Sequence, residues 1–262
     1  MRKPALFVIQ SSEEKSPSGQ VIGIIPARWA SSRFPGKPLH LLNGKPLLQH
    51  VYEQAERCKS LDGLLVATDD ARIAALCEIM GAPYVITRED HPSGTDRIAE
   101  AALSCPMASH FINIQGDEPL LDPQLVQDLV TSLKNDPALE MATAASPIRD
   151  EAQINDSNIV KVVINAANDA LYFSRSAIPY RRSAIPSLPT FRHLGIYGYR
   201  ADFLQHFVTL PPSLLEQSEG LEQLRALENG VRIKILITEH EAIGLDSPEQ
   251  VPFIESLLSQ QH

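Results

Sequence analysis

The chain has 262 residues, of which 44% are hydrophobic and 21% are charged, and its formal net charge is -9. This length suits one large domain, or one domain with a substantial insert, with enough apolar residues for a sizeable core. Phosphate-backbone binding needs basic patches, so we expect no nucleic-acid partner. An anionic small molecule stays compatible with the charge, because a few convergent arginine and lysine side chains can dominate one cleft.

The amino-terminal segment, residues 1–20, is expected to be a mobile extension without a catalytic role. Its apolar run, residues 5–9, is shorter than the stretch of about 7–15 apolar residues in a secretory signal peptide. No other run approaches the ~20 apolar residues of a membrane span. Three scattered cysteines form neither a metal-ligand spacing nor a disulfide framework. These observations predict a cytoplasmic protein with no membrane partner.

Apolar runs and helical periodicities alternate from residue 21 onward. Runs typical of strands buried in a sheet occupy residues 21–26, 64–68, 84–86 and 111–114. Helical spacing of apolar residues follows each of them, and Asp70 and Asp122 stand where helix caps are expected. This order predicts an α/β fold with a mainly parallel sheet and helices on both faces.

The pattern changes after residue 147. Residues 160–164 and 170–173 flank a polar turn and predict a β-hairpin, a proline-rich stretch follows, and residues 194–199 predict a further strand. We expect an antiparallel insert at about 149–200 within a single domain that spans 21–262. Near its end the chain returns to the α/β pattern, with a strand at 233–238 and a last helix opened by a capping box at Ser247.

The loop after the first strand carries three cations, Arg28, Arg33 and Lys37, within ten residues. Ligands of open α/β sheets bind at the carboxyl ends of the strands, where this loop lies. Basic side chains and exposed backbone N–H groups suit a triphosphate, although the spacing is not that of a Walker loop. Any single arginine here would be better explained as part of a solvated surface loop, and it is the three cations together that favour a phosphate site.

Two acidic loops are candidates for metal binding. Asp117, in the sequence QGDEP, directly follows a buried strand, and Mg²⁺ prefers one or two carboxylates with phosphate oxygens and water. Asp246 precedes the cap of the last helix. Each residue also has an ordinary explanation, because QGDEP suits a turn and an acidic residue is favoured near a helix start.

Polar residues elsewhere have less specific patterns. The loop HPSGTDR, residues 91–97, opens a helix, so Ser93 and Gly94 suit either a nucleotide base edge or a helix cap. Arg175 would suit a bidentate contact with a carboxylate, and His193 would suit sugar hydroxyls. A lone histidine and a helical glutamate such as Glu222 are more often structural or solvated.

Together these segments resemble the 3-deoxy-manno-octulosonate (Kdo) cytidylyltransferases over nearly the whole chain from residue 21. The most specific motifs are IPAR at 25–28, FPGKPL at 34–39, QGDEP at 115–119, LYFSR at 171–175 and RHLGIYGY at 192–199. The last two separate the chain from the related sialic-acid enzymes. Phe34 and Asp96 are mild departures, since leucine and often glutamate are expected there.

The resemblance implies a Rossmann-like nucleotidyltransferase fold, a homodimer built through the insert, and the cofactor Mg²⁺. Catalysis would rest on Arg28, Lys37 and Asp117. The implied nucleotide-binding residues are Ala27, Arg28, Arg33, Lys37, Ser93, Gly94 and Asp117. The implied sugar-binding residues are Gln115, Arg175, His193, Tyr197 and Glu222. The implied metal ligands are Asp117 and Asp246.

The implied reaction transfers CMP from CTP to the anomeric hydroxyl of Kdo, releases pyrophosphate and forms CMP-Kdo for lipopolysaccharide biosynthesis. Alternatives are a cytidylyltransferase for sialic acid or an amino analogue of Kdo, a nucleotide-sugar glycosyltransferase, and a non-catalytic nucleotide-binding module. Hydride chemistry is not expected, because no GxGxxG motif follows the first strand.

Overall fold

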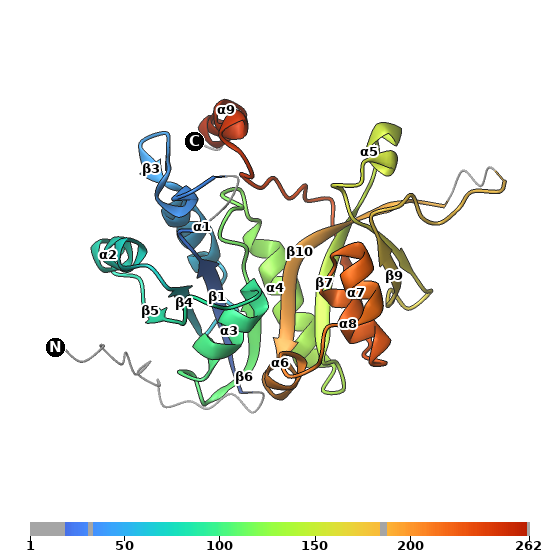
Figure 1. Cartoon of the computed structure of the whole chain (residues 1–262), viewed down its shortest axis with the longest axis horizontal. Coiled ribbons are helices and arrows are strands. Elements are labelled where there is room, and N and C mark those ends of the chain that lie inside the picture. Colours follow the sequence, from blue (N-terminus) through green and yellow to red (C-terminus); the bar gives the residue numbers. More distant parts are fainter. Residues whose placement is uncertain (1–18, 31–33, 184–187, 261–262) are drawn as a thin grey trace.

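A computed structural model describes residues 19–30, 34–183 and 188–260 of the chain. Seven strands form the path of the main sheet in these ranges, in the order β11–β7–β10–β6–β1–β4–β5 (Figure 1). Their bounds are β1 (Gln20–Ala27), β4 (Gly63–Thr68), β5 (Tyr84–Ile86), β6 (Ala108–Asn113), β7 (Met141–Pro147), β10 (Phe191–Arg200) and β11 (Ile233–Ile237). Neighbouring strands pair in parallel except around β10, which runs antiparallel between β6 and β7. The prediction of a mainly parallel sheet is confirmed.

Helices cover both faces of this sheet, as the alternating pattern predicted. One face packs against α1 (Leu47–Glu56), α2 (Ala71–Met80), α4 (Pro123–Asn135) and α9 (Val251–Ser259). The other face packs against α3 (Gly94–Ala102), α6 (Ala201–Phe207) and α8 (Gln223–Glu228). Strand β1 serves both cores, because Val21 and Ile25 point to the first while Ile22 and Ile24 point to the second. Burying each such side chain stabilises the fold by about 1.5–3 kcal/mol.

The helix ends follow local chemistry that the sequence shows. Asp70 accepts a hydrogen bond from Arg72 N at 2.8 Å and Asp122 accepts one from Gln124 N at 2.9 Å, so both predicted caps are confirmed. The predicted capping box of Ser247 is also present. It opens a short 3-10 helix, η2 (Pro248–Gln250), which leads into α9.

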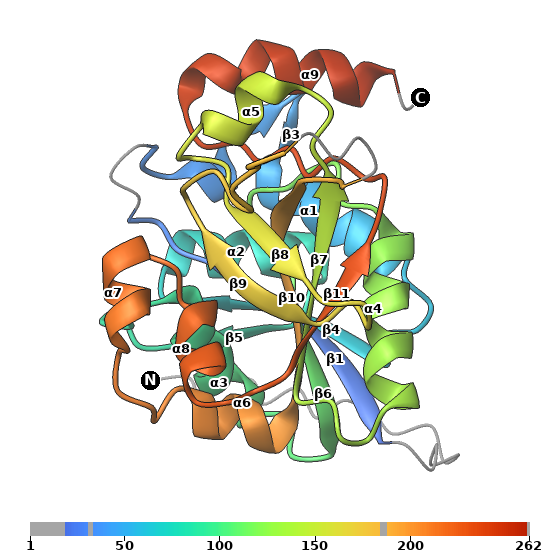
Figure 2. The same ribbon diagram turned by 90° about the vertical axis from the view of Figure 1, so that its right-hand side faces the viewer.

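The predicted hairpin is formed by β8 (Lys161–Ile164) and β9 (Ala170–Ser174). It joins the main sheet through β8, which pairs antiparallel with the start of β10, and α8 lies beside β9 (Figure 2). Strand β10 is longer than predicted and lies inside the main sheet, between two strands that precede the hairpin in sequence. The antiparallel region is therefore continuous with the main sheet, and its division from the rest of the domain stays a prediction.

Several short elements gave no clear pattern in the sequence. These are η1 (Lys37–Leu39), β2 (Leu41–Leu42), β3 (Lys45–Pro46), α5 (Glu151–Asn155) and α7 (Leu214–Glu219). Strand β7 was also not predicted, because its buried positions are mostly alanine and threonine, where β-branched aliphatic residues would be expected.

Other predictions concern the cysteines, the membrane and the amino terminus. Cys58 and Cys77 are buried, Cys105 is partly exposed, and all three are free thiols. Within the described ranges, no helix combines the length and apolar character needed to cross a membrane. The predicted extension lies outside the described residues up to residue 18, and β1 begins at Gln20.

Candidate active site

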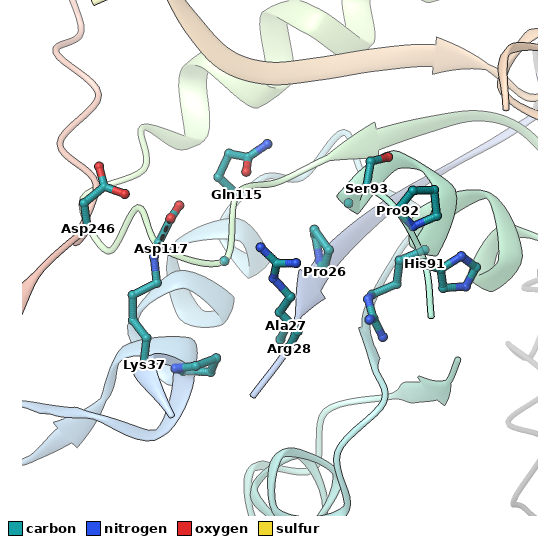
Figure 3. A pocket seen from close by; sticks show the side chains of 14 residues that line it. Pro26, Ala27, Arg28, Lys37, His91, Pro92, Ser93, Gln115, Asp117 and Asp246 are labelled. Atoms are coloured by element: carbon teal, nitrogen blue, oxygen red, sulfur yellow. Dashed lines mark hydrogen bonds and ion pairs between the residues drawn. The ribbon is translucent and has the colours of Figure 1, made fainter. Parts of the chain in front are cut away.

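A cavity of about 290 Å³ opens at the carboxyl ends of β1 and β6 (Figure 3). The loop after β1, the start of α3, the loop after β6 and the segment before η2 form its wall. The lining residues are Pro26, Ala27, Arg28, Lys37, Pro38, His91, Pro92, Ser93, Gly94, Arg97, Gln115, Gly116, Asp117 and Asp246. The structure therefore brings together eight of the predicted site residues from four separate sequence segments.

The loop after β6 reaches the cavity because Gly116 lets two backbones approach closely. A Cβ atom at Gly116 would lie 2.7 Å from the carbonyl oxygen of Pro26, closer than any side chain tolerates. The adjacent Gln115 turns the other way, and its Nε2 donates to the carbonyl of Gly195 on β10 at 2.6 Å. Gln115 thus joins the cavity wall to the strand that carries two of the predicted sugar-binding residues, His193 and Tyr197.

A cation and a carboxylate from distant segments meet on this wall. Lys37 Nζ donates to Asp117 Oδ2 at 2.7 Å, and the two side chains are 15% and 31% exposed. Asp246 faces the same space as Asp117 in Figure 3. The backbone N–H of Leu245 donates to the carbonyl of Asp117 at 2.8 Å, which holds the two acidic loops side by side.

The donor set on this wall fits a magnesium ion. Asp117 and Asp246 supply two carboxylates, and Mg²⁺ commonly takes one or two carboxylates and completes its shell with phosphate oxygens and water. In the described part of the chain, no cluster of three or more histidine, cysteine, aspartate or glutamate residues could hold a metal by protein ligands alone. Burial raises the pKa of the neighbouring Glu118 to about 8, and the charges of Asp117 and Asp246 add to this effect.

The loop before α3 combines a helix cap with an open edge toward the cavity. Ser93 is the N-cap, with Oγ accepting from Thr95 N at 3.1 Å and Asp96 N at 3.2 Å. Glu222, next to α8 in sequence, lies against this loop at 2.9 Å from Ser93 Oγ and 2.7 Å from Thr95 Oγ1. Burial raises the pKa of Glu222. Glu222 is thus not an ordinary solvated position on a helix.

Two other predicted sugar-binding residues lie on β10. His193 and Tyr197 have ring centroids 5.4 Å apart, and His193 Nε2 lies 3.0 Å from Thr143 Oγ1. Burial lowers the pKa of His193 to about 3, so its imidazole is neutral at physiological pH. Burial also raises the pKa of Tyr197 far above its usual range, so the phenol stays protonated.

Arg175 directly follows β9 and contacts the end of α7. Its Nε donates to Glu219 O at 2.7 Å, Nη1 to Ser157 O at 3.0 Å and Nη2 to Gly220 O at 3.4 Å. A guanidinium has five N–H donors, so one N–H on each terminal nitrogen stays outside these contacts. The cavity wall includes Gln115 from the predicted sugar set but not the other four members, which lie beyond it.

Some lining residues were not predicted, although the motif HPSGTDR contains them. Arg97 is 3% exposed and donates to Thr87 Oγ1 and Asp69 Oδ2, both at 2.6 Å. His91 Nε2 forms a hydrogen bond with the carboxylate of Glu100 on α3. A charged residue on the buried face of a helix is the signal that could have found Arg97. The predicted nucleotide ligand Arg33 lies outside the described residues and is not tested.

Comparison with known proteins agrees with this geometry. The model of a family described as Cytidylyltransferase matches residues 22–234. A 3-deoxy-manno-octulosonate cytidylyltransferase of Syntrophobacter fumaroxidans is 48% identical over 92% of this chain and 98% of its own. An 8-amino-3,8-dideoxy-manno-octulosonate cytidylyltransferase of Shewanella halifaxensis is 48% identical over 90% of this chain and 97% of its own.

One solved structure is similar to this chain in both fold and sequence. It is a CMP:2-keto-3-deoxy-manno-octonic acid synthetase in complex with CTP, with a TM-score of 0.89 and 42% identity. The match covers 93% of this chain and all of that chain (100%). The family model spans most of the chain and the relatives are covered almost completely, so the chain belongs to the cytidylyltransferase family.

Proposed function

We propose that this enzyme transfers CMP from CTP to the anomeric hydroxyl of Kdo and releases pyrophosphate. The observation that carries the proposal is the shared cavity of Arg28, Lys37, Asp117 and Asp246, which unites cations for a triphosphate with carboxylates for a metal. Relatives that are 48% identical, with 98% and 97% of their own length covered, bear the names of cytidylyltransferases for Kdo and for its 8-amino analogue.

The nucleotide would lie along the loop after β1. Arg28 and Lys37 would hold the triphosphate, as guanidinium and ammonium groups form short, charge-assisted hydrogen bonds with phosphate oxygens. The backbone of Ala27 and the Ser93–Gly94 turn would recognise the cytosine edge. All five residues line the cavity, and Ser93 is already fixed by its role as a helix cap.

Asp117 and Asp246 would hold Mg²⁺ at the triphosphate end. When bound, the ion would offset the charge of the triphosphate and lower the pKa of the attacking hydroxyl. Lys37 would leave Asp117 for a phosphate oxygen, so that no carboxylate or ammonium loses an opposite charge.

The sugar would bind on the β10 side of Gln115. The two remaining terminal N–H groups of Arg175 suit a bidentate contact with a carboxylate. His193, Tyr197 and Glu222 would contact the hydroxyl groups. The anomeric hydroxyl loses its proton to solvent, and its oxygen forms a bond to the α-phosphorus. The bond from that phosphorus to the α–β bridging oxygen breaks, and pyrophosphate leaves with that oxygen. The residues would act by alignment and charge compensation.

A second candidate substrate is 8-amino-3,8-dideoxy-manno-octulosonate, since the Shewanella relative that bears this name is as similar as the Kdo enzymes. The two sugars differ at one substituent, so comparing them as acceptors distinguishes the two assignments. We further propose a cytoplasmic homodimer built through residues 149–200, acting in lipopolysaccharide biosynthesis.

The experiment is pyrophosphate release from CTP with Kdo, its 8-amino analogue or sialic acid as the acceptor. We expect the highest kcat/KM for Kdo and negligible rates for sialic acid. A higher kcat/KM for the amino sugar would move the assignment to that substrate. If none of the three acceptors is turned over, the proposed activity is wrong.

A further inference from the structure

Trp29 follows Arg28 in the loop after β1 and is the only tryptophan of the chain. The guanidinium carbon of Arg72, on α2, lies 3.3 Å from the centroid of its ring, in a cation–π stack. Arg72 is held there by two hydrogen bonds to Asp70, from Nε to Oδ1 at 2.9 Å and from Nη2 to Oδ2 at 2.6 Å. Asp70 is in turn fixed as the N-cap of α2.

Gly36 lies against the same indole. A Cβ atom at Gly36 would be 2.8 Å from Trp29 Cη2, and the φ of Gly36 is +71°, which favours glycine. Gly36 N also donates to the carbonyl of Trp29 at 3.0 Å. The indole thus has one contact with the guanidinium of Arg72 and another with the backbone that precedes Lys37.

These contacts act on the positions next to the two proposed triphosphate ligands. Trp29 is adjacent to Arg28, and Gly36 is adjacent to Lys37. The Trp29–Gly36 hydrogen bond joins the neighbours of these two ligands, and the Arg72 stack ties Trp29 to the start of α2. Arg72 and Trp29 line no part of the cavity, so they would act on the ligand only through Arg28 and Lys37.

We propose that Arg72 and Trp29 are positioning residues that hold Arg28 and Lys37 in place for CTP. The inference rests on the proposed function for the identity of the ligand, but the stack itself does not. Pre-ordering these two ligands lowers the entropy lost on nucleotide binding, and this gain appears in CTP affinity. Once CTP is bound, the phosphates hold Arg28 and Lys37 whether or not the Arg72–Trp29 stack is present, so kcat should change little.

Arg72→Leu removes the guanidinium while keeping an aliphatic side chain on α2. Asp70→Asn keeps an oxygen that can cap the helix but removes the charge that orients Arg72. The matched control is Arg57→Leu, which changes an exposed arginine at the end of α1 that contacts Gln54. Two readouts apply to each variant: acrylamide quenching of Trp29 fluorescence in the free enzyme, and the KM for CTP against kcat and the KM for Kdo.

We expect both variants to increase the quenching constant, because one face of the indole loses its cover. We expect the KM for CTP to rise about two- to fivefold, the range that an exposed cation–π contact supports. The kcat, the KM for Kdo and the melting temperature should match the wild type, and Arg57→Leu should change nothing.

Unchanged quenching, or increased quenching with an unchanged KM for CTP, would overturn the proposal. A fall in kcat or in melting temperature without a rise in the KM for CTP would also overturn it, because the residues would then be structural. If the wild type lacks the proposed activity, fluorescence-detected CTP binding replaces the KM. The proposed function would then fail while the proposed role of Arg72 is still tested.

Discussion

Lys37 Nζ lies 2.7 Å from Asp117 Oδ2, although the two residues are 80 positions apart in sequence. The ion pair joins a proposed triphosphate ligand to a proposed metal ligand. A magnesium–nucleotide complex would offer each of them a new partner of opposite charge. The pair therefore compensates both charges before the nucleotide binds, which matters because a partly buried charge without a partner is costly.

Asparagine at Asp117 or at Asp246 should lower kcat by about 10²–10³-fold, the scale of losing one preorganised electrostatic contact. The substitution keeps the shape of the side chain and removes a charge from the proposed metal shell. The double variant should lose much less than the product of the single losses, because residues that act as a unit are non-additive. Pyrophosphate release over a Mg²⁺ titration measures all three.

Asp128→Asn is a suitable control, since Asp128 is a carboxylate on α4 whose oxygen accepts from Gln124 in an exposed contact. Its activity should equal that of the wild type. Near-normal activity of Asp246→Asn at saturating Mg²⁺ would show that Asp246 is not a metal ligand. Asp246 would then be only an acidic residue that precedes a helix.

The fold was predicted well where one physical signal dominates. The apolar runs of β1 and β4 and the caps at Asp70 and Asp122 were visible because burial on both faces and orphan N–H groups leave clear local patterns. Strand β7 was missed because its small residues fit a crowded sheet interior, a constraint that only its neighbours define. The position of β10 depends on long-range pairing, which no local pattern encodes.

The candidate site divides in the same way. Loops at strand ends could be predicted to converge, and Lys37, Ser93, Gln115 and Asp117 do so. The contact of Glu222 with Ser93 could not be predicted, because the two residues are 129 positions apart in sequence and meet only in the folded chain.

Arg175→Ala should raise the KM for Kdo about 10- to 100-fold and leave CTP binding unchanged. Hydrogen bonds to charged groups are worth about 1.5–3 kcal/mol, which corresponds to this range. Arg149→Ala removes an exposed arginine, paired with Glu239, and serves as the control. Initial rates at varied Kdo, together with direct CTP binding, measure the effect. Normal Kdo kinetics with impaired CTP binding would show that Arg175 binds the nucleotide and not the sugar.

Glu222→Gln should raise the KM for CTP as well as the KM for Kdo, each several-fold. Its carboxylate accepts from Ser93 and Thr95, and glutamine offers one acceptor oxygen where two are used. The neutral hydrogen bond that survives is also weaker than a charge-assisted one. Initial-rate kinetics with each substrate varied in turn test this. A change confined to the KM for Kdo would show that Glu222 contacts only the sugar.

His193 should make the fold less stable as the pH falls. Its pKa is lowered to about 3 by burial, while an unfolded imidazole titrates near 6.5. Between these values the unfolded chain binds a proton that the folded chain does not, so the free energy of unfolding falls by at most about 1.4 kcal/mol per pH unit. His193→Asn should show a shallower fall between pH 6.5 and 5.

Part of the fall should persist in that variant, because burial also lowers the pKa of His110 and of His240. Urea unfolding at several pH values gives both slopes. Parallel slopes for the wild type and His193→Asn would mean that His193 titrates alike in the folded and unfolded chains.

The central claim is that this site joins the α-phosphorus of CTP to a sugar acid. The most direct measurement follows CTP labelled at the α-phosphorus, with Kdo as acceptor, in the presence and absence of EDTA. The account predicts that the label appears in CMP-Kdo, at a rate far above that with UTP or ATP, and that EDTA stops the transfer. Label that ends in free CMP or CDP, equal use of UTP, or transfer that persists in EDTA would contradict it.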